Sequence, residues 1–152
     1  MLQTALDIKK RAEEKGIEFL LPTQHQVVDS YEPVKGGKIV TKRFRSSLLI
    51  GLVGRNIGVE TVAHFTVALQ DTRLIIWNGP MGVFEEPPFD QGTIGVAKAV
   101  AEAADRGATV IVAGGDSVSA VTRASRRSHH PHFNRRRRYT RIPGVVALAD
   151  KL

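Results

Sequence analysis

The stretch ATVIVAGGDSVSAV, residues 108–121, constrains the fold of this chain more than any other segment. ATVIV is a continuous apolar run that predicts a buried strand, the two glycines predict a turn, and the residues after them predict a helix that Asp116 or Ser117 could cap. RLIIWNGP, from Arg73, predicts a second strand that runs into a loop. Strands that alternate with helices through short connections favour a parallel sheet covered by helices.

The remaining periodic segments extend this alternation. TIGVAKAVAEAADRG, residues 93–107, and LQTALDIKKRAEEKG, residues 2–16, predict amphipathic helices that each end at a glycine. Residues 17–21, IEFLL, predict a short buried strand that Pro22 stops, QVVDS and KIVT predict a lesser strand pair, and GVVAL predicts a last strand. We therefore expect an α/β fold, a Rossmann-like three-layer parallel sheet with helices on both faces, in one domain.

The composition excludes several classes of protein. The chain has no cysteine, which excludes disulfides, thiolate catalysis and the usual structural zinc sites. No apolar run reaches the ~18 residues of a membrane span, and no charged-then-apolar leader follows Met1, so we expect neither a span nor a signal peptide. The expected location is the cytoplasm.

The basic character of the chain belongs to one segment. The net charge is +7, and residues 123–141 carry eight arginines with no lysine and no acid, so the rest of the chain carries −1. Neither this segment nor residues 41–56, TKRFRSSLLIGLVGRN, shows a helical or strand period, and we predict no element for either.

Two loops carry groups that suit phosphate chemistry. A glycine turn at a helix N-terminus favours an anion, and Asp116 would be placed to hold magnesium; the alternative is a glycine turn with an aspartate cap. WNGPMGVFE supplies a carboxamide, free backbone and a carboxylate directly after a predicted strand. In open α/β sheets, ligands bind at the carboxyl ends of the strands.

Four motifs in their order resemble one enzyme family. IIWNGPMGVFE, FDQGTIGVAKAVAEA, ATVIVAGGDSVSAV and PGVVAL are similar to the later part of the C-terminal, nucleotide-binding domain of phosphoglycerate kinases. AEEKGIEFLLPT and GRNIGVET fit the preceding part, so the resemblance covers nearly the whole chain and implies that residues 1–152 form an incomplete copy of that domain. The family transfers a phosphoryl group between 1,3-bisphosphoglycerate and ADP, giving 3-phosphoglycerate and ATP, with magnesium, and its members are usually monomeric.

The resemblance implies roles for individual residues. Gly114 and Gly115 match the catalytic glycine-rich turn, Asp116 would be the magnesium ligand, and Ala113 occupies a position that is usually glycine. Val83 would touch the base and Glu85 the ribose hydroxyls. The full set of implied nucleotide-binding residues is Gly58, Asn78, Gly79, Pro80, Gly82, Val83, Glu85, Asp116 and Ser117.

The sequence also departs from the family's pattern at several positions and lacks several of the family's segments. Asn56 and Val59 replace the usual aspartate and proline around Gly58. The N-terminal domain that binds the phosphoglycerate, the opening strands of the C-terminal domain and the late Ser-Thr-Gly-Gly-Gly-Ala loop are not present in this sequence. We therefore expect the chain alone to be inactive, and 3-phosphoglycerate to be a partner only if the other domain is supplied.

The arginine segment has an interpretation of its own. Codons for residues 131–141, PHFNRRRRYTR, can be regrouped by one base to read His-Ile-Ser-Thr-Gly-Gly-Gly-Ala-Thr-Leu-Glu, which is the family's missing segment. We interpret residues 123–141 as the product of a reading-frame shift. The rival interpretation is an arginine-rich patch that binds nucleic acid.

The histidines are interpreted as structural. His129, His130 and His132 could be called a metal cluster, but without a periodic scaffold or other ligands they are interpreted as solvated loop residues. His25 and His64 are expected to be structural or exposed, and no membrane partner is expected.

Overall fold

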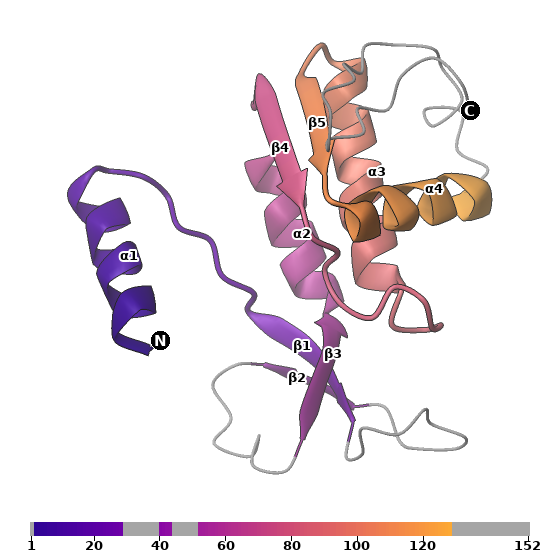
Figure 1. Ribbon diagram of the computed structural model, residues 1–152, viewed down its shortest axis with the longest axis horizontal. Helices are drawn as coiled ribbons and strands as arrows, with labels where there is room; N and C mark the ends of the chain where they lie inside the picture. Colours follow the sequence, from indigo (N-terminus) through magenta and orange to yellow (C-terminus); the bar gives the residue numbers. More distant parts are fainter. Residues whose placement is uncertain (1, 29–39, 44–51, 129–152) are drawn as a thin grey trace.

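The computed structural model describes residues 2–28, 40–43 and 52–128 of the protein (Figure 1). The elements of this part of the chain are, in order, α1 (Leu2–Glu14), β1 (Gln24–Val28), β2 (Val40–Arg43), β3 (Val53–Ile57), α2 (Val59–Ala68), β4 (Leu74–Asn78), α3 (Gln91–Asp105), β5 (Thr109–Ala113) and α4 (Gly115–Ser128). The strands form two sheets, one of three strands in the order β2-β1-β3 and one of two strands, β4 and β5.

The core lies on one face of the β4–β5 pair. These strands are parallel, with Ile75 opposite Val110 and Trp77 opposite Val112, and all four side chains are buried. They pack with apolar residues of α3 and α4, and α2 adds Val62 and Phe65 at the margin of the same cluster. Because side chains alternate across a strand, Leu74 and Ile76 point to the opposite face, where both are exposed.

The expected three-layer sheet is therefore seen only in part. The fold is mixed α/β, and the parallel strand pair with helices is present, but the described residues form two small sheets. β1 pairs antiparallel with both β2 and β3, with a register shift between Gln26 and Val27. The lesser strand pair of this sheet was predicted, but a local sequence pattern indicates a strand and not its neighbours, so the addition of β3 to that pair was not foreseen.

Several predicted elements are confirmed. The helices predicted at residues 2–16 and 93–107 are α1 and α3, and the strands predicted in RLIIWNGP and ATVIV are β4 and β5. QVVDS and KIVT overlap β1 and β2, which pair with each other. Both helix-ending glycines have the left-handed backbone that favours glycine, with φ of 64° at Gly16 and 108° at Gly107.

Other predictions are wrong. Residues 17–21 form no strand and run as an extended connection from α1 to β1 (Figure 1). A strand needs a hydrogen-bonding neighbour, and no described residue provides one there. β3 and α2 were not predicted. β3 overlaps the end of the aperiodic stretch 41–56, and its pattern is not apolar throughout because its buried residues include the polar Arg55 and Asn56. GVVAL lies outside the described residues.

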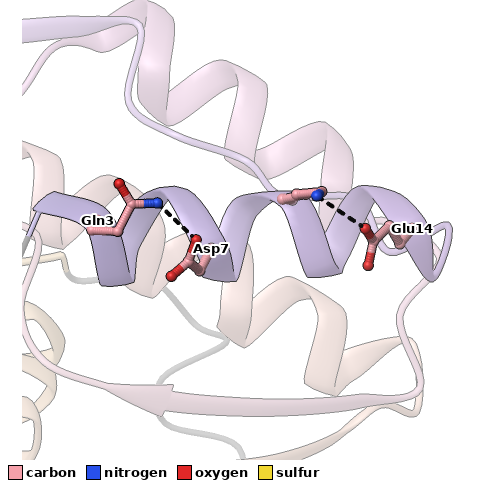
Figure 2. A network of polar contacts seen from close by, with 4 residues as sticks. Gln3, Asp7 and Glu14 are labelled. Atoms are coloured by element: carbon pink, nitrogen blue, oxygen red, sulfur yellow. Dashed lines mark hydrogen bonds and ion pairs between the residues drawn. The ribbon is translucent and has the colours of Figure 1, made fainter.

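Helix α1 stands apart from the rest of the molecule (Figure 1). Its stability is local: Gln3 donates a hydrogen bond of 2.9 Å to Asp7, and lysines pair with glutamates one turn further on, as at Glu14 (Figure 2). Such exposed pairs contribute a few tenths of a kcal/mol each, about 0.2–0.5. Among the described residues, no helix is long and apolar enough to cross a membrane.

Candidate functional site

Two glycine loops meet at the carboxyl ends of β4 and β5. The last residues of the two strands, Asn78 and Ala113, are register partners. The backbone N–H of Gly79 donates a hydrogen bond of 2.6 Å to the Ser117 hydroxyl, which joins the loop after β4 to the first turn of α4. Gly79 has φ of 105° and Gly114 has φ of 88°, values at which any other residue would be strained. The strand pair therefore places Asn78, Gly79 and the Gly114 turn side by side.

Helix α4 begins at Gly115, two residues earlier than a cap at Asp116 requires and three earlier than a cap at Ser117, so that prediction is wrong. Gly115 is the first helical residue, and the N–H of Val118 donates to the Gly114 carbonyl at 3.1 Å. Asp116 lies exposed in the first turn. The Ser117 side chain is buried, because its oxygen is used internally by Gly79.

The first turn of α4 is suited to an anion. Backbone N–H groups in the first turn of a helix have no acceptor within the helix, and the helix dipole adds positive potential there. No heavy atom lies within 4 Å of the position that a Cβ would occupy on Gly115, so the turn is open on that side. Phosphate groups commonly bind where such N–H groups and glycines converge.

The loop that follows β4 is held at several points. The indole N–H of Trp77 donates to the Gly79 carbonyl at 2.6 Å, and the Met81 N–H donates to the Thr93 hydroxyl at 3.1 Å. The Val83 N–H donates to the Arg55 carbonyl of β3 at 2.7 Å. The loop is therefore built against its own strand, the start of α3 and the edge of β3.

Helix α4 holds the far end of the same loop. A guanidinium N–H of Arg123 donates to the Glu85 carbonyl at 2.7 Å. The Glu85 side chain is exposed, and Pro80, Gly82 and Val83 are half-buried. Through Ser117 and Arg123, α4 therefore contacts the loop after β4 both at Gly79 and at Glu85.

Gly58 has a different environment from the other predicted residues. Its N–H donates to the Gln24 carbonyl at 2.8 Å, and a Cβ at this position would collide with the Gln24 side chain. Gly58 precedes α2 and is buried. The Gly58 carbonyl also accepts a bond of 3.1 Å from Val62 of α2. The close approach of the Gln24 side chain explains why a glycine is needed there without a ligand.

Sequence reasoning missed the residues that hold the loop. Arg55 and Asn56 are buried polar residues of β3, and Arg123 was interpreted only as the start of the aberrant segment. The sequence signal that could have indicated them is the pair of polar residues inside the short stretch VGRNI. Buried polar side chains are usually hydrogen-bonded, so such a pair predicts partners elsewhere in the fold. His129, His130, His132 and residues 135–138 lie outside the described part of the chain, and within that part no cluster of three or more histidine and acidic side chains could hold a metal ion.

Parallel strands that end in glycine loops at a helix N-terminus are an arrangement common in α/β proteins that bind phosphate groups. The sequence model of one family, described as phosphoglycerate kinase, matches residues 1–134. The chain belongs to the phosphoglycerate kinase family. A phosphoglycerate kinase of Prochlorococcus marinus is 38% identical over 156 residues, which cover 98% of this chain and 38% of the relative. A cytosolic phosphoglycerate kinase 3 of Arabidopsis thaliana is 41% identical over 131 residues, covering 84% of this chain and 32% of the relative.

Solved structures give the same result. Phosphoglycerate kinase from Coxiella burnetii superposes with a TM-score of 0.71 at 32% identity, covering 81% of this chain and 30% of that structure. The enzyme from Pyrococcus horikoshii gives a TM-score of 0.56 at 31% identity, with 80% and 29% covered. The chain thus spans about a third of the length of the relatives that it matches.

Proposed function

We propose that this chain carries part of the C-terminal nucleotide-binding domain of a phosphoglycerate kinase and binds ADP or ATP at the joined ends of β4 and β5. The observation that carries the proposal is the Gly79–Ser117 hydrogen bond, because it brings the loop after β4 against the glycine turn of α4. The phosphates would lie over the N–H groups of Gly114 and Gly115 and beside Asn78. Val83 would contact the base and Glu85 the ribose hydroxyls.

Asp116 would hold the magnesium ion. Its carboxylate is exposed in the first turn of α4, next to the open space at Gly115, and carboxylate oxygens suit this hard cation. Magnesium supplies positive charge that neutralises the phosphate oxygens. The chain's own contribution is the fixed arrangement of glycine N–H groups, which needs no rearrangement when a phosphate arrives.

The family's reaction needs more than this site. Phosphoryl transfer depends on positioning and charge stabilisation from both sides of the transferred group. A site that holds the group from one side only is therefore expected to lose most of the catalytic rate. We propose that the chain alone binds nucleotide without turnover, and that 3-phosphoglycerate joins only when the remaining domain is supplied. A cytoplasmic location fits this role.

The arginine segment is part of the same proposal. A reading-frame shift over residues 123–141 would replace the Ser-Thr-Gly-Gly-Gly-Ala loop and with it one further set of phosphate-binding N–H groups. The family sequence model matches residues 1–134, so its match includes the first part of this segment and ends directly before the run Arg135 to Arg138. Arginine codons in the coding DNA that cannot be regrouped into glycine codons would end this interpretation.

Calorimetric titration tests the nucleotide site. The chain should bind ADP in the presence of magnesium, and Asp116→Ala should remove the magnesium dependence. Glu85→Ala should weaken ADP but leave inorganic pyrophosphate unchanged, because only the ribose contact is lost. A coupled assay with ADP and 1,3-bisphosphoglycerate should show no turnover by the chain alone. If the chain binds neither ADP nor pyrophosphate, no nucleotide site exists here.

A further inference from the structure

We infer that Asn56 of β3 is a positioning residue for the nucleotide loop, and that it holds the part of the loop that faces the base and not the part that faces the phosphates. The inference rests on the proposed nucleotide site. It starts from the side chain of Asn56, which is only 3% exposed and lies where three parts of the molecule meet. Those parts are β1, the loop at Gly82 and the first turn of α3.

The contacts of Asn56 define this junction. Its side-chain amide donates to Gln26 of β1 at 3.1 Å, and its backbone forms an antiparallel bridge with Gly82. A Cβ on Gly82 would lie 2.6 Å from the Asn56 Cα and 2.9 Å from its side-chain oxygen, and would collide with the Arg55 carbonyl. A Cβ on Gly92 of α3 would collide with the same side-chain oxygen. Both glycines are therefore needed so that Asn56 can fit between the loop and the helix.

The junction fixes one end of the loop only. Directly after Gly82, the Val83 N–H donates to Arg55, the neighbour of Asn56 in β3. At the other end, Gly79 is held by Ser117 and Trp77, which belong to α4 and β4. Gly79 and Val83 thus have different supports: Gly79 depends on the β4–α4 contact, and Val83 depends on β3 of the antiparallel sheet, beside Asn56. Arg123 of α4 holds the Glu85 carbonyl two residues after Val83, so the comparison is confined to these two positions.

The different supports of Gly79 and Val83 give Gly82 a structural role in the site that does not require contact with a ligand. Its lack of a side chain permits the close approach of the loop to β3, and that approach sets the position of Val83. The buried oxygen of Asn56 has no hydrogen-bond partner in the described structure, which makes the junction sensitive to any change of shape there. A displaced junction would move Val83 while leaving the glycine turn of α4 in place.

The test compares two ligands and a matched variant. Asn56→Ala should weaken the binding of ADP with magnesium by roughly tenfold and leave inorganic pyrophosphate within about twofold, because only the base end of the loop is released. Thr61→Ala is the control: Thr61 is equally buried and also bonds to β1, at Gln24, but does not contact the loop. It should not change the ratio of the two affinities. Equal losses for both ligands in Asn56→Ala would overturn the inference.

A second readout does not depend on nucleotide. Hydrogen exchange of the Val83 N–H should accelerate in Asn56→Ala relative to that of the Val118 N–H, which is bonded within α4, and the ratio should stay unchanged in Thr61→Ala. If wild type binds no nucleotide, the proposed function fails, and this ratio still decides the role of Asn56. An unchanged ratio in Asn56→Ala would reject it.

Two further variants separate shape from stability. Asn56→Asp keeps the size of the side chain, and the Gln26 amide can rotate to donate to it, so the ligand ratio should return toward that of wild type. Gly82→Ala keeps Asn56 but forces the loop away from β3, and it should reproduce the selective loss of ADP binding. If Asn56→Ala does not fold, Gly82→Ala serves as the decisive variant.

Discussion

Helices α1 and α3 have similar amphipathic sequences but differ in how much of each helix is buried. Both carry an apolar stripe and end at a glycine, yet α3 buries eight residues, among them Val96 and Val100, whereas α1 buries Ala12 alone. The apolar residues of α1 remain in solvent, with Leu2 77% exposed. Amphipathicity therefore defines the face of a helix that can be buried, but a neighbouring element decides whether it is.

The connection after α1 continues this contrast. Ile17, Phe19 and Leu21 are exposed, although they are as apolar as the strand residues of the core. Leu20 lines an apolar pocket of about 270 Å³ together with Phe65, Leu69 and Ile76 of the body. The N-terminal region thus reaches the body at this apolar pocket.

The largest expected effect compares two neighbouring isoleucines of β4. Ile75 is 7% exposed and Ile76 is 65% exposed, so they differ in burial and not in chemistry. Ile75→Ala should lower the free energy of unfolding by ~2–5 kcal/mol, because it leaves a cavity in the core. Ile76→Ala should lower it by less than about 1 kcal/mol. Urea denaturation followed by circular dichroism measures both, and equal losses would mean that another element covers the outer face of β4.

A smaller effect is expected at Gly114 and Gly115, the two glycines of the turn where α4 begins. Gly114→Ala introduces a side chain at φ of 88°, where its Cβ would lie 3.1 Å from the side-chain oxygen of Asn78, and should cost about 1–2 kcal/mol of stability. Gly115→Ala is the matched control, since the position is helical and open, and it should be neutral or slightly stabilising. Thermal melts of the two variants decide the comparison. A cost at Gly115 as large as that at Gly114 would show that the turn is not the strained element.

The smallest effect is expected in α1. Leu6 is 52% exposed, so Leu6→Gln should change the free energy of unfolding by no more than ~0.5 kcal/mol. Val100→Gln, at a buried position of α3, is the contrasting variant and should lower the free energy of unfolding by about 1–3 kcal/mol, because it buries an amide without partners. If Leu6→Gln were as damaging as Val100→Gln, α1 would be packed against the body in solution.

The sequence by itself determined the elements whose patterns are local. The apolar run before the two glycines, the stripe of residues 93–107 and the strand before Asn78 were all predicted and are present as β5, α3 and β4. The burial pattern of each of these elements can be read from consecutive residues. A strand or helix that packs on a core repeats its apolar side chains with the period of that strand or helix. The family was also visible in these motifs, and its sequence model matches residues 1–134.

Only the tertiary structure decided which residues distant in sequence support the predicted site. Ser117 was predicted to contact phosphate and Gly58 to contact nucleotide; the structure adds that the Ser117 hydroxyl accepts a bond from Gly79 and that Gly58 packs on Gln24. The strand predicted at residues 17–21 is absent from the described structure, and Asn56 occupies a junction that no motif indicated. Hydrogen bonds and close packing join residues distant in sequence, and their energies depend on neighbours that a local pattern does not specify.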